Sequence, residues 1–586
     1  MDTKIDLRWL LLNKLVDFDN LQNLYKLSVI VLFLIFLLLT LSPIIISRFR
    51  KSKFKSLLLS DNTFIFSLIA FISATRWPCF LPPELNPDES FLIAGAMKLL
   101  KDPVVWRSIE TGTTGPLNLY SLLISSLLGL RLEYASARMV GLFLIVVSSI
   151  CLFYSLRYIY GNLTARLSVM PVVTTIACMT FPDYVHYTSE HVSIAILSIA
   201  LLILCKLYSN NLIFNKRLIF IFGFILGLVP FAKLQAVPIA LSISLITLHI
   251  LWIRRNSITQ FLRNFYAFLL GSVLFPLLTM LYIFVFSLQD VFWRSYIQHN
   301  LYYANSYKAS VGFLSRLYFV FGPADTRVLF ALAVIFFLLG LSFLIYWFIS
   351  QPQRDRLSDT SIFFLYSLII LAASIYSVMK PGNFFTHYLL FLIFPCGFLI
   401  GVLVGEFFKV YKYSGINLPK LKLSPVMAII IVIMIIGSTL QLFSHVRRES
   451  SYIDMRYHFL LNYTSPVSQT ILKYASQNGS MAIWGWDSKI YVETGIIPAT
   501  RYVDSVGQMF SNPRQQYYVR QFADDLLKSK AALFIESTAG FAKIWEKYVG
   551  IPQQSPEDFP DVAIILKKYY KLVDDVQGFK IYVKQN

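Results

Sequence analysis

Residues 134–157 read YASARMVGLFLIVVSSICLFYSLR, an apolar run with almost no charge at its centre. A helix of this length can cross the roughly 30 Å hydrocarbon core of a bilayer. Comparable runs lie on both sides of it along the chain, so the sequence predicts an α-helical polytopic membrane protein with about 12 transmembrane helices. The predicted spans are residues 27–47, 57–78, 134–157, 165–182, 191–208, 217–232, 236–253, 264–287, 326–349, 360–379, 387–408 and 425–444.

The composition agrees with a membrane protein and excludes an ordinary soluble one. Of the 586 residues, 56% are hydrophobic and 14% are charged, against roughly 45–50% and 25% in soluble domains. The formal net charge is +20, which in a soluble protein would indicate nucleic acid. Residues 446–586 carry 17 Lys+Arg and 14 Asp+Glu, so the part before them carries 35 and 18. A basic excess confined to the membrane part predicts loops that orient the protein, and no nucleic-acid partner.

Basic residues concentrate in every second loop. SRFRKSKFK (47–55) and IRRNSITQFLR (253–263) belong to one set of loops, whereas the other set is acidic and rich in histidine. Because basic loops stay in the cytoplasm, we expect a multi-pass plasma (inner) membrane protein with the second set and the C-terminal tail on the extracytoplasmic face. The short run GPLNLYSLLISSLLGL (115–130) preserves this alternation only as a helix at the membrane surface.

The C-terminal tail differs in character from the membrane part. Short β-type runs (MAIWGW, AALFIE, FKIYVK) alternate there with amphipathic helical stretches. This alternation predicts a small α/β domain on the outer face. The expected division is an N-terminal segment with an extra transmembrane helix and a basic cytoplasmic loop (1–56), a transmembrane domain (57–445) and the extracytoplasmic α/β domain (446–586).

The first outer loop contains two adjacent carboxylates, Asp88 and Glu89, in LPPELNPDESFLIAGAMKLLKDP. Pro87 and Asp88 form a plausible helix start, and the apolar residues that follow recur at helical spacing. The helix is expected to lie along the interface with both carboxylates facing the helix bundle, where they are candidates for acid–base chemistry. The alternative is purely structural: Asp88 caps the helix and Glu89 interacts favourably with its dipole.

The second outer loop, FPDYVHYTSEH, brings His186 and Glu190 close together in the sequence. With Asp88 or Glu89 these side chains could bind a substrate or a metal ion, although the spacing does not match a zinc signature. The alternative is a solvated loop in which Glu190 lies near the start of the next helix.

A lysine inside apolar sequence is the clearest functional candidate. Lys233, in LGLVPFAKLQAVP, is flanked by prolines that indicate a broken helix, and its cation would suit a phosphate or carboxylate. The alternative is a lysine that extends to the interface. His387 and Tyr388 precede the eleventh span, where His387 could equally be a hydrogen-bonded interfacial histidine. YIQHNLYYANSYK (296–308) could line a sugar site or form an aromatic belt.

The order of these motifs resembles the polyprenyl-phosphate-dependent glycosyltransferases of the GT-C type. The resemblance is to the group of protein O-mannosyltransferases and lipid A aminoarabinose transferases, and it covers roughly residues 57–445. It implies a GT-C-like catalytic domain that is active on the outer face. The motifs that carry the resemblance are NPDESF, TTGPLNLY, YTSEH, PFAKLQAVP and the HY of THYLLFLIFP.

The resemblance also implies roles for the residues. Asp88 matches the acidic residue of the first loop that such enzymes use as catalytic base or to position the acceptor, with Glu89 as its neighbour in the same motif. A sugar would pass from its phosphate to an acceptor hydroxyl with inversion at the anomeric carbon. A divalent metal ion is left open as a cofactor. The remaining matches are Lys233, His387 and Tyr388 for the donor phosphate, and Glu190 with His186 for substrate or metal.

The implied partners are a polyprenyl-phosphate-linked sugar donor, an acceptor that is a glycan, lipid or protein, and the surrounding membrane lipid. Two other functions are compatible with the sequence. A transporter or flippase of a lipid-linked glycan would place ionisable groups at mid-span and show repeated halves. A non-catalytic protein that binds an envelope polymer would use motifs of the tail such as IWGWDSKIYVETG (483–495).

Overall fold

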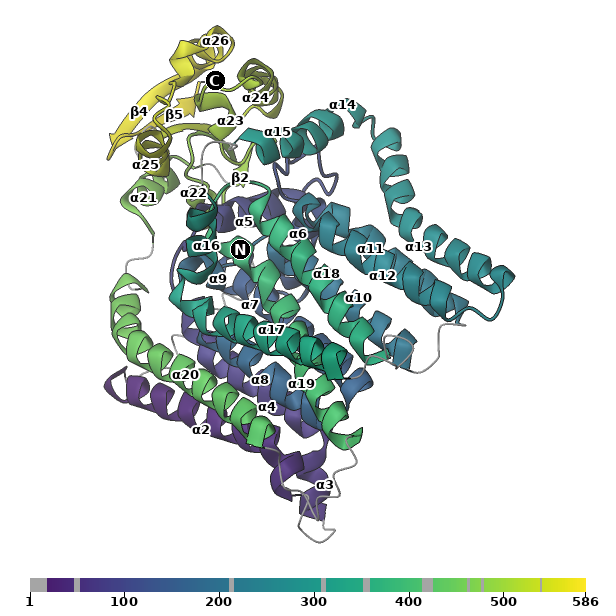
Figure 1. Ribbon diagram of the computed structural model, residues 1–586. Helices are drawn as coiled ribbons and strands as arrows, with labels where there is room; N and C mark the ends of the chain where they lie inside the picture. The colour runs from purple at the N-terminus through teal and green to yellow at the C-terminus, as the bar shows by residue number, and fades with distance from the viewer. Residues whose placement is uncertain are drawn as a thin grey trace.

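The computed structural model describes residues 18–46, 53–209, 215–306, 312–350, 359–413, 425–460, 464–475, 479–537 and 540–585. Long helices pack into a bundle, and a C-terminal α/β domain sits on one end of it (Figure 1). We call this end of the bundle the domain face. The predicted fold class, a helical membrane domain followed by a small α/β domain, is confirmed.

A helix occupies each of the twelve predicted spans. Among the described residues, ten helices are long and apolar enough to cross a membrane. The other two, α8 (Asn162–Cys178) and α11 (Lys216–Ala232), have 17 residues each, so the number of crossings stays a prediction. The ten are α2 (Phe18–Ile45), α4 (Asp61–Arg76), α7 (Tyr134–Tyr160), α10 (Glu190–Ser209), α12 (Val237–Ile253), α13 (Ile258–Val285), α17 (Ala324–Ser350), α18 (Asp359–Met379), α19 (Leu390–Tyr413) and α20 (Pro425–Leu460). Of these, α4 reaches this length together with η2 (Trp77–Phe80), and α12 together with η4 (Leu234–Ala236).

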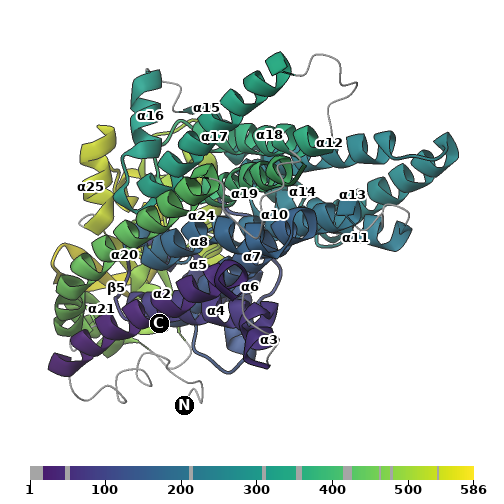
Figure 2. The same ribbon diagram turned by 60° about the horizontal axis from the view of Figure 1, so that its bottom comes forward.

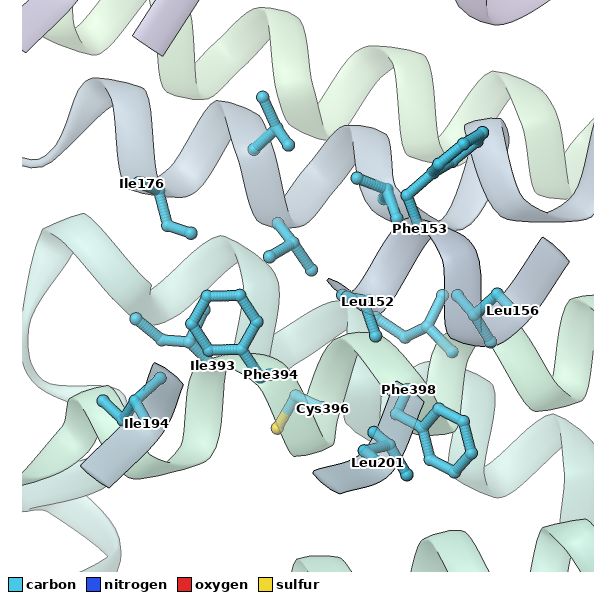
Figure 3. Packing of buried hydrophobic residues seen from close by; sticks show 14 of the residues in the cluster. Leu152, Phe153, Leu156, Ile176, Ile194, Leu201, Ile393, Phe394, Cys396 and Phe398 are labelled. Carbon is cyan, nitrogen blue, oxygen red and sulfur yellow. The ribbon is translucent and has the colours of Figure 1, made fainter. Parts of the chain in front are cut away.

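Small residues bring α19 close to its neighbours at the centre of the bundle. Gly397, Gly401 and Gly405 are spaced four residues apart and therefore share one face of the helix. A Cβ added at Gly401 would lie 2.4 Å from a methyl carbon of Leu156, on α7. Glycines at such positions let helix backbones approach closely within a membrane. Figure 3 shows the apolar side chains of α7, α8, α10 and α19 that fill the surrounding core.

Helices α11 and α13 extend to one side of the bundle in both views (Figures 1 and 2). They pack against each other through glycines. A Cβ at Gly271 of α13 would meet the backbone oxygen of Phe220 at 2.1 Å, and one at Gly227 of α11 would meet that of Ser272 at 2.4 Å. This pair is therefore held together by close backbone contact.

The connections at the domain face contain short helices. The first loop (residues 81–133) carries α5 (Pro87–Leu99) and α6 (Pro116–Leu127), and the second loop (residues 179–189) carries α9 (Pro182–Val185). Helix α6 is the predicted short apolar helix; its position at a membrane surface stays a prediction. The other short helices are α3 (Lys53–Leu59), η2 (Trp77–Phe80), η4 (Leu234–Ala236), α14 (Gln289–Val291), the π-helix η5 (Phe292–Gln298), α15 (His299–Ser306), α16 (Phe313–Phe321) and η6 (Thr386–Leu389).

The C-terminal domain is built on a five-stranded sheet with strand order β2-β1-β3-β5-β4. Strand β1 is parallel to β2 and β3, whereas β5 is antiparallel to β3 and β4. The strands are β1 (Ser480–Trp484), β2 (Ile497–Pro498), β3 (Leu533–Ser537), β4 (Tyr570–Val576) and β5 (Phe579–Lys584). The helices are α21 (Pro466–Tyr474), α22 (Lys489–Thr494), α23 (Val506–Met509), α24 (Gln515–Ser529), α25 (Gly540–Val549), η7 (Pro556–Asp558) and α26 (Pro560–Tyr569).

The two faces of this sheet pack against different partners. Side chains that alternate along a strand point to opposite faces. Met481 and Ile483 of β1 belong to a hydrophobic core that also contains α5 of the first loop. Ala482 and Trp484 belong to a second core, with the domain's own α24 and α26. The domain therefore shares one of its two cores with the membrane domain.

Candidate active site

Lys233 lies where α11 ends and the chain continues through η4 into α12. Its backbone is extended (φ −162°, ψ 125°), which interrupts the helix as the flanking prolines predicted. The side chain is buried, and its ammonium group donates to Ser189 Oγ at 2.6 Å and to the carboxylate of Glu190. It also lies 5.1 Å from the ring centroid of Tyr388. The membrane domain thus buries a cation at its domain-face end.

Glu190 is the partner of this cation. It is the first residue of α10, where the helix dipole favours a negative charge. Its carboxylate is fully buried and accepts hydrogen bonds from Lys233 and from the hydroxyl of Thr188. A buried carboxylate and ammonium compensate each other's charge, which makes the pair tolerable away from water. Glu190 is therefore placed to hold Lys233 in position.

His387 and His186 lie together beside Asp183 of the second loop. Both histidines are buried, and their ring centroids are 6.0 Å apart in an edge-to-face arrangement. His387 Nδ1 is 3.8 Å from Asp183 Oδ2, too far for a hydrogen bond. Burial alone would raise the pKa of Asp183, but the interactions with His387 and His186 and the hydrogen bond from Asn86 outweigh it and lower the pKa to about 2. Asp183 is therefore an anion facing the two rings.

Tyr388 connects the cation to the segment between α13 and α17. Its ring faces the ammonium of Lys233, and its hydroxyl is 2.9 Å from that of Tyr303, on α15. The hydroxyl of Tyr296 donates to the backbone oxygen of Pro230 at 2.5 Å and so anchors the same segment next to the break in α11. Of the predicted segment 296–308, the structure therefore brings Tyr303 to Tyr388.

Asp88 presents an exposed carboxylate at the start of α5. Asn86, not Asp88, caps this helix: its side-chain oxygen accepts from the backbone N–H of Asp88 at 2.9 Å. Its side-chain nitrogen donates to Asp183 Oδ1 at 2.9 Å, which links the first loop to the second. The charge of Asp88 interacts with His387. Asn86 therefore takes the capping role that the alternative gave to Asp88, and the carboxylate of Asp88 is left exposed.

Glu89 has a different environment from its neighbour. Arg138 Nε donates to its Oε1 at 2.8 Å and Arg138 Nη2 to its Oε2 at 2.5 Å, with both side chains fully buried. The backbone N–H of Tyr187 donates to Oε1 at 3.0 Å. Adjacent helical residues diverge by about 100°, which directs Glu89 into the protein while Asp88 stays exposed. Glu89 therefore joins both loops to α7.

Sequence reasoning missed Arg138, and it named Tyr303 only as one member of the segment 296–308. Arg138 is an arginine inside an apolar run, and such a group is expensive enough in a membrane to have marked it as a candidate. Beyond Glu89, it donates to the backbone oxygens of Cys79, Pro82 and Pro83. For Tyr303 the signal was weak, because several tyrosines lie in that segment and nothing local distinguishes one from the others.

The possible metal site is not supported by the described residues. Among them, no group of three or more His, Cys, Asp or Glu side chains is arranged to hold a metal ion. Glu190 is engaged with Lys233 and Thr188, and Glu89 with Arg138. His186 Nδ1 is 2.9 Å from the backbone oxygen of Pro182. We therefore assign no chemistry to a metal.

A small, half-open apolar pocket with a cavity volume of about 30 Å³ lies between α10, α12, α18 and α19. Ile194 lines it one turn from Glu190, Ile239 lines it near the start of α12, and Leu390 lies one turn from His387. Helices α10, α12 and α19 thus line the pocket, and each has one end near Glu190, Lys233 or His387. An apolar surface therefore lies about one helical turn from Glu190 and from His387.

No family model and no curated protein sequence matches this chain. Among solved structures it is similar to ArnT from Cupriavidus metallidurans bound to undecaprenyl phosphate, at 10% identity and a TM-score of 0.54 over 89% of this chain and 98% of that one. It is also similar to the Archaeoglobus fulgidus oligosaccharyltransferase tethered with an acceptor peptide, at 11% identity and a TM-score of 0.41 over 90% and 74%. ArnT is a GT-C glycosyltransferase. The similarity to ArnT shows that the chain has the GT-C fold that its motifs predicted.

Proposed function

We propose that this protein is a membrane glycosyltransferase that moves a sugar from a polyprenyl-phosphate donor to an acceptor on the extracytoplasmic face. The observation that carries the proposal is the placement of Lys233. A buried cation at a helix break lies against the ring of Tyr388, and the charge of the exposed Asp88 carboxylate acts on the same tyrosine. The GT-C fold, shared with a protein that binds undecaprenyl phosphate, supports the same assignment.

The donor would bind with its phosphate at Lys233, and its isoprenoid chain would run along the helices that line the small apolar pocket. A phosphate oxygen would take hydrogen bonds from the ammonium group that Glu190 and Ser189 now hold. His387 and Tyr388 lie beside this cation and would line the rest of the phosphate site. Charge-assisted hydrogen bonds of this kind are about twice as strong as neutral ones. Glu190 keeps the cation in place when no donor is bound.

Transfer requires one base and one group that stabilises the leaving phosphate. The Asp88 carboxylate would accept the proton of the acceptor hydroxyl as its oxygen attacks the anomeric carbon. The bond between that carbon and the phosphate oxygen breaks from the opposite side, and its electron pair leaves with the polyprenyl phosphate. Lys233 stabilises the charge that develops there. The anomeric configuration is inverted, and the products are the glycosylated acceptor and the lipid phosphate.

The other predicted residues would act by positioning. Glu89 has no free carboxylate oxygen for an acceptor, because Arg138 and the Tyr187 N–H occupy it. It would set the orientation of α5 and therefore of Asp88. His186 lies behind His387, where it would support the orientation of that ring.

The direct test compares Asp88→Asn with Asp290→Asn in purified protein supplied with a panel of polyprenyl-phosphate-linked sugars and acceptors. Asp290 is an exposed carboxylate paired with Arg294 and serves as the matched control. We expect Asp88→Asn to lower transfer by about 10²–10⁴-fold while polyprenyl phosphate binding is retained, and Asp290→Asn to behave as wild type. Transfer by Asp88→Asn at the wild-type rate would refute the mechanism. Lipid movement across liposomes without any transfer would favour a flippase.

A further inference from the structure

The C-terminal domain and the Asp88 helix share one hydrophobic core. Leu92 and Ile93 of α5 are buried in the same cluster as Met481, Ile483 and Ile535 of the sheet. The exposed fraction of each of these side chains is at most 1%. Apolar side chains from two segments that exclude water together form one packed unit. The C-terminal domain therefore packs against α5.

Hydrogen bonds also join α5 to the C-terminal domain, near the C-terminal end of the helix. The ammonium group of Lys98 donates to the backbone oxygens of Ala499 at 2.9 Å and Thr500 at 2.5 Å. The backbone N–H of Glu110, also in the first loop, donates to the oxygen of Arg501 at 2.9 Å. Burial lowers the pKa of Lys98 to about 8, as expected of an ammonium held between two protein surfaces. We call residues 499–505 the docking loop.

The docking loop is rigidly attached to its own domain. Arg501 donates through Nε and Nη2 to the carboxylate of Asp525, on α24, each at 2.8 Å, and its backbone N–H donates to the same carboxylate. At the other end of the loop, the Ser505 hydroxyl donates to the backbone oxygen of Ile483 at 2.7 Å, and its N–H bonds to Gly485. The position of Lys98 is therefore tied to α24 and to the sheet.

Helix α5 transmits this position to Asp88. It has 13 residues, so at about 1.5 Å per residue it spans about 20 Å as one rigid rod. Asn86 fixes its start to Asp183, and Lys98 fixes its other end to the docking loop. Asp504, at the end of that loop, lies close enough for its charge to interact with Asp88.

We propose that the C-terminal domain is a clamp that holds α5 in a fixed position. Lys98 is the positioning residue that links the docking loop, through α5, to Asp88. This inference rests on the proposed function and assigns the domain a role in that site. The domain acts on the rate of the chemical step by orienting the base. A domain that only recruited the acceptor would instead act on acceptor affinity.

The two roles are separated by steady-state kinetics of Lys98→Met. Methionine keeps the packing of the lysine stem but loses both hydrogen bonds to the docking loop. We expect kcat to fall at least tenfold, with the KM values for donor and acceptor changing less than twofold. Lys101→Met, at an exposed position on the same segment, is the matched control and should behave as wild type. An unchanged kcat, or a rise confined to the acceptor KM, would overturn the proposal.

Asp525→Asn tests the clamp from the domain side without touching α5. It weakens the bidentate contact with Arg501 that keeps the docking loop in place. It should lower kcat in the same direction as Lys98→Met, and the double variant should be little worse than Lys98→Met alone, since both changes break one chain of contacts. Fully additive effects would show that the two residues act independently and would contradict the clamp.

Hydrogen exchange separates a failed clamp from a failed functional proposal, because it needs no substrate. In wild type, the amides of residues 87–99 should be protected. Lys98→Met should raise their exchange rates while the exchange in α24 stays unchanged, and Lys101→Met should leave both unchanged. Faster exchange in α5 without any measurable transfer by wild type would refute the proposed function but keep the clamp as a structural device. Unchanged exchange in α5 would overturn the clamp.

Discussion

The guanidinium group of Arg138 donates to both carboxylate oxygens of Glu89, and both side chains are fully withdrawn from solvent. Arg138 belongs to α7, whereas Glu89 lies in the first turn of α5. The same carboxylate accepts the N–H of Tyr187 from the second loop. One buried ion pair therefore joins the three segments around the candidate active site and leaves the adjacent Asp88 exposed.

The first prediction concerns the contrast between these neighbouring carboxylates. Glu89→Gln leaves a buried guanidinium without its counter-charge, which typically costs about 3–5 kcal/mol. We expect it to lower the thermal unfolding midpoint in detergent clearly, and activity with it. Asp88→Asn should abolish most transfer while the unfolding midpoint stays within the error of wild type. Equal stability losses in the two variants would contradict the separate roles assigned here.

The second prediction concerns the partners of the buried pair. Replacing both residues by apolar side chains removes both charges, so no unpaired group is left behind. The double variant Glu89→Met/Arg138→Met should therefore be more stable than Arg138→Met alone. Thermal unfolding of the two proteins under identical detergent conditions measures the difference. If the double variant were less stable than Arg138→Met, the unpaired Glu89 carboxylate would not be the main reason why the single variant loses stability.

The third prediction concerns donor binding. Lys233→Met removes the buried cation, and the loss of a charged hydrogen bond corresponds to about 10- to 100-fold weaker binding of polyprenyl phosphate. Lys380→Met provides the matched control, because Lys380 is exposed and follows α18 near the same end of the bundle. Titration of the purified proteins with polyprenyl phosphate gives both affinities. Equal affinities for Lys233→Met and wild type would exclude this lysine from the phosphate site.

The fourth prediction concerns the apolar pocket. Ile243→Trp would place a larger side chain against the pocket wall of α12, whereas Leu241→Trp lies on the exposed side of the same helix. The first change should weaken binding of a long-chain polyprenyl phosphate and leave that of a short-chain analogue nearly unchanged, because only the chain needs the pocket. The second should affect neither. A comparable loss for both chain lengths would indicate a general distortion and not a filled chain site.

The fifth prediction concerns pH. Burial and the charge of Asp504 raise the pKa of Glu110 to about 8, and burial and the charge of Asp88 raise that of Asp504 to about 7. The ordinary values are 4.5 and 3.8, so the unfolded chain ionises first as pH rises. The stability that these two groups contribute is fully present below about pH 4, and it is lost progressively as the pH rises from about 4 to about 8.

Across pH 5 to pH 8, we therefore expect the thermal unfolding midpoint of wild type to fall relative to that of the double variant Glu110→Gln/Asp504→Asn. The comparison isolates these two groups, because other buried groups such as Glu84 and His299 titrate in both proteins. Lys98, whose pKa is about 8, acts in the opposite direction and is likewise present in both proteins. An equally steep dependence in the double variant would exclude these two carboxyl groups as the cause.

Local patterns in the sequence predicted much of the architecture. Apolar runs of membrane-spanning length predicted the helices, and the Pro-flanked Lys233 predicted the break between α11 and α12. The proline and polar residues before α5 predicted its start within a residue. The β-type runs of the tail overlap β1, β3 and β5 to within two residues at their ends. These features depend on neighbours within a few positions, and periodicity and capping report such neighbours directly.

Only the tertiary structure decided which polar groups meet. Glu89 pairs with Arg138, which is separated from it by 49 positions in the sequence. Lys98 donates to the backbone of Ala499 across a separation of 401 positions. No local pattern distinguishes Glu89 from Asp88, because both belong to the same helical turn. Their roles diverge only once α7, the second loop and the docking loop pack around α5. The sequence by itself therefore determined the helices and the candidate residues, whereas long-range packing decided which of them are buried and paired and which one is left exposed at the site.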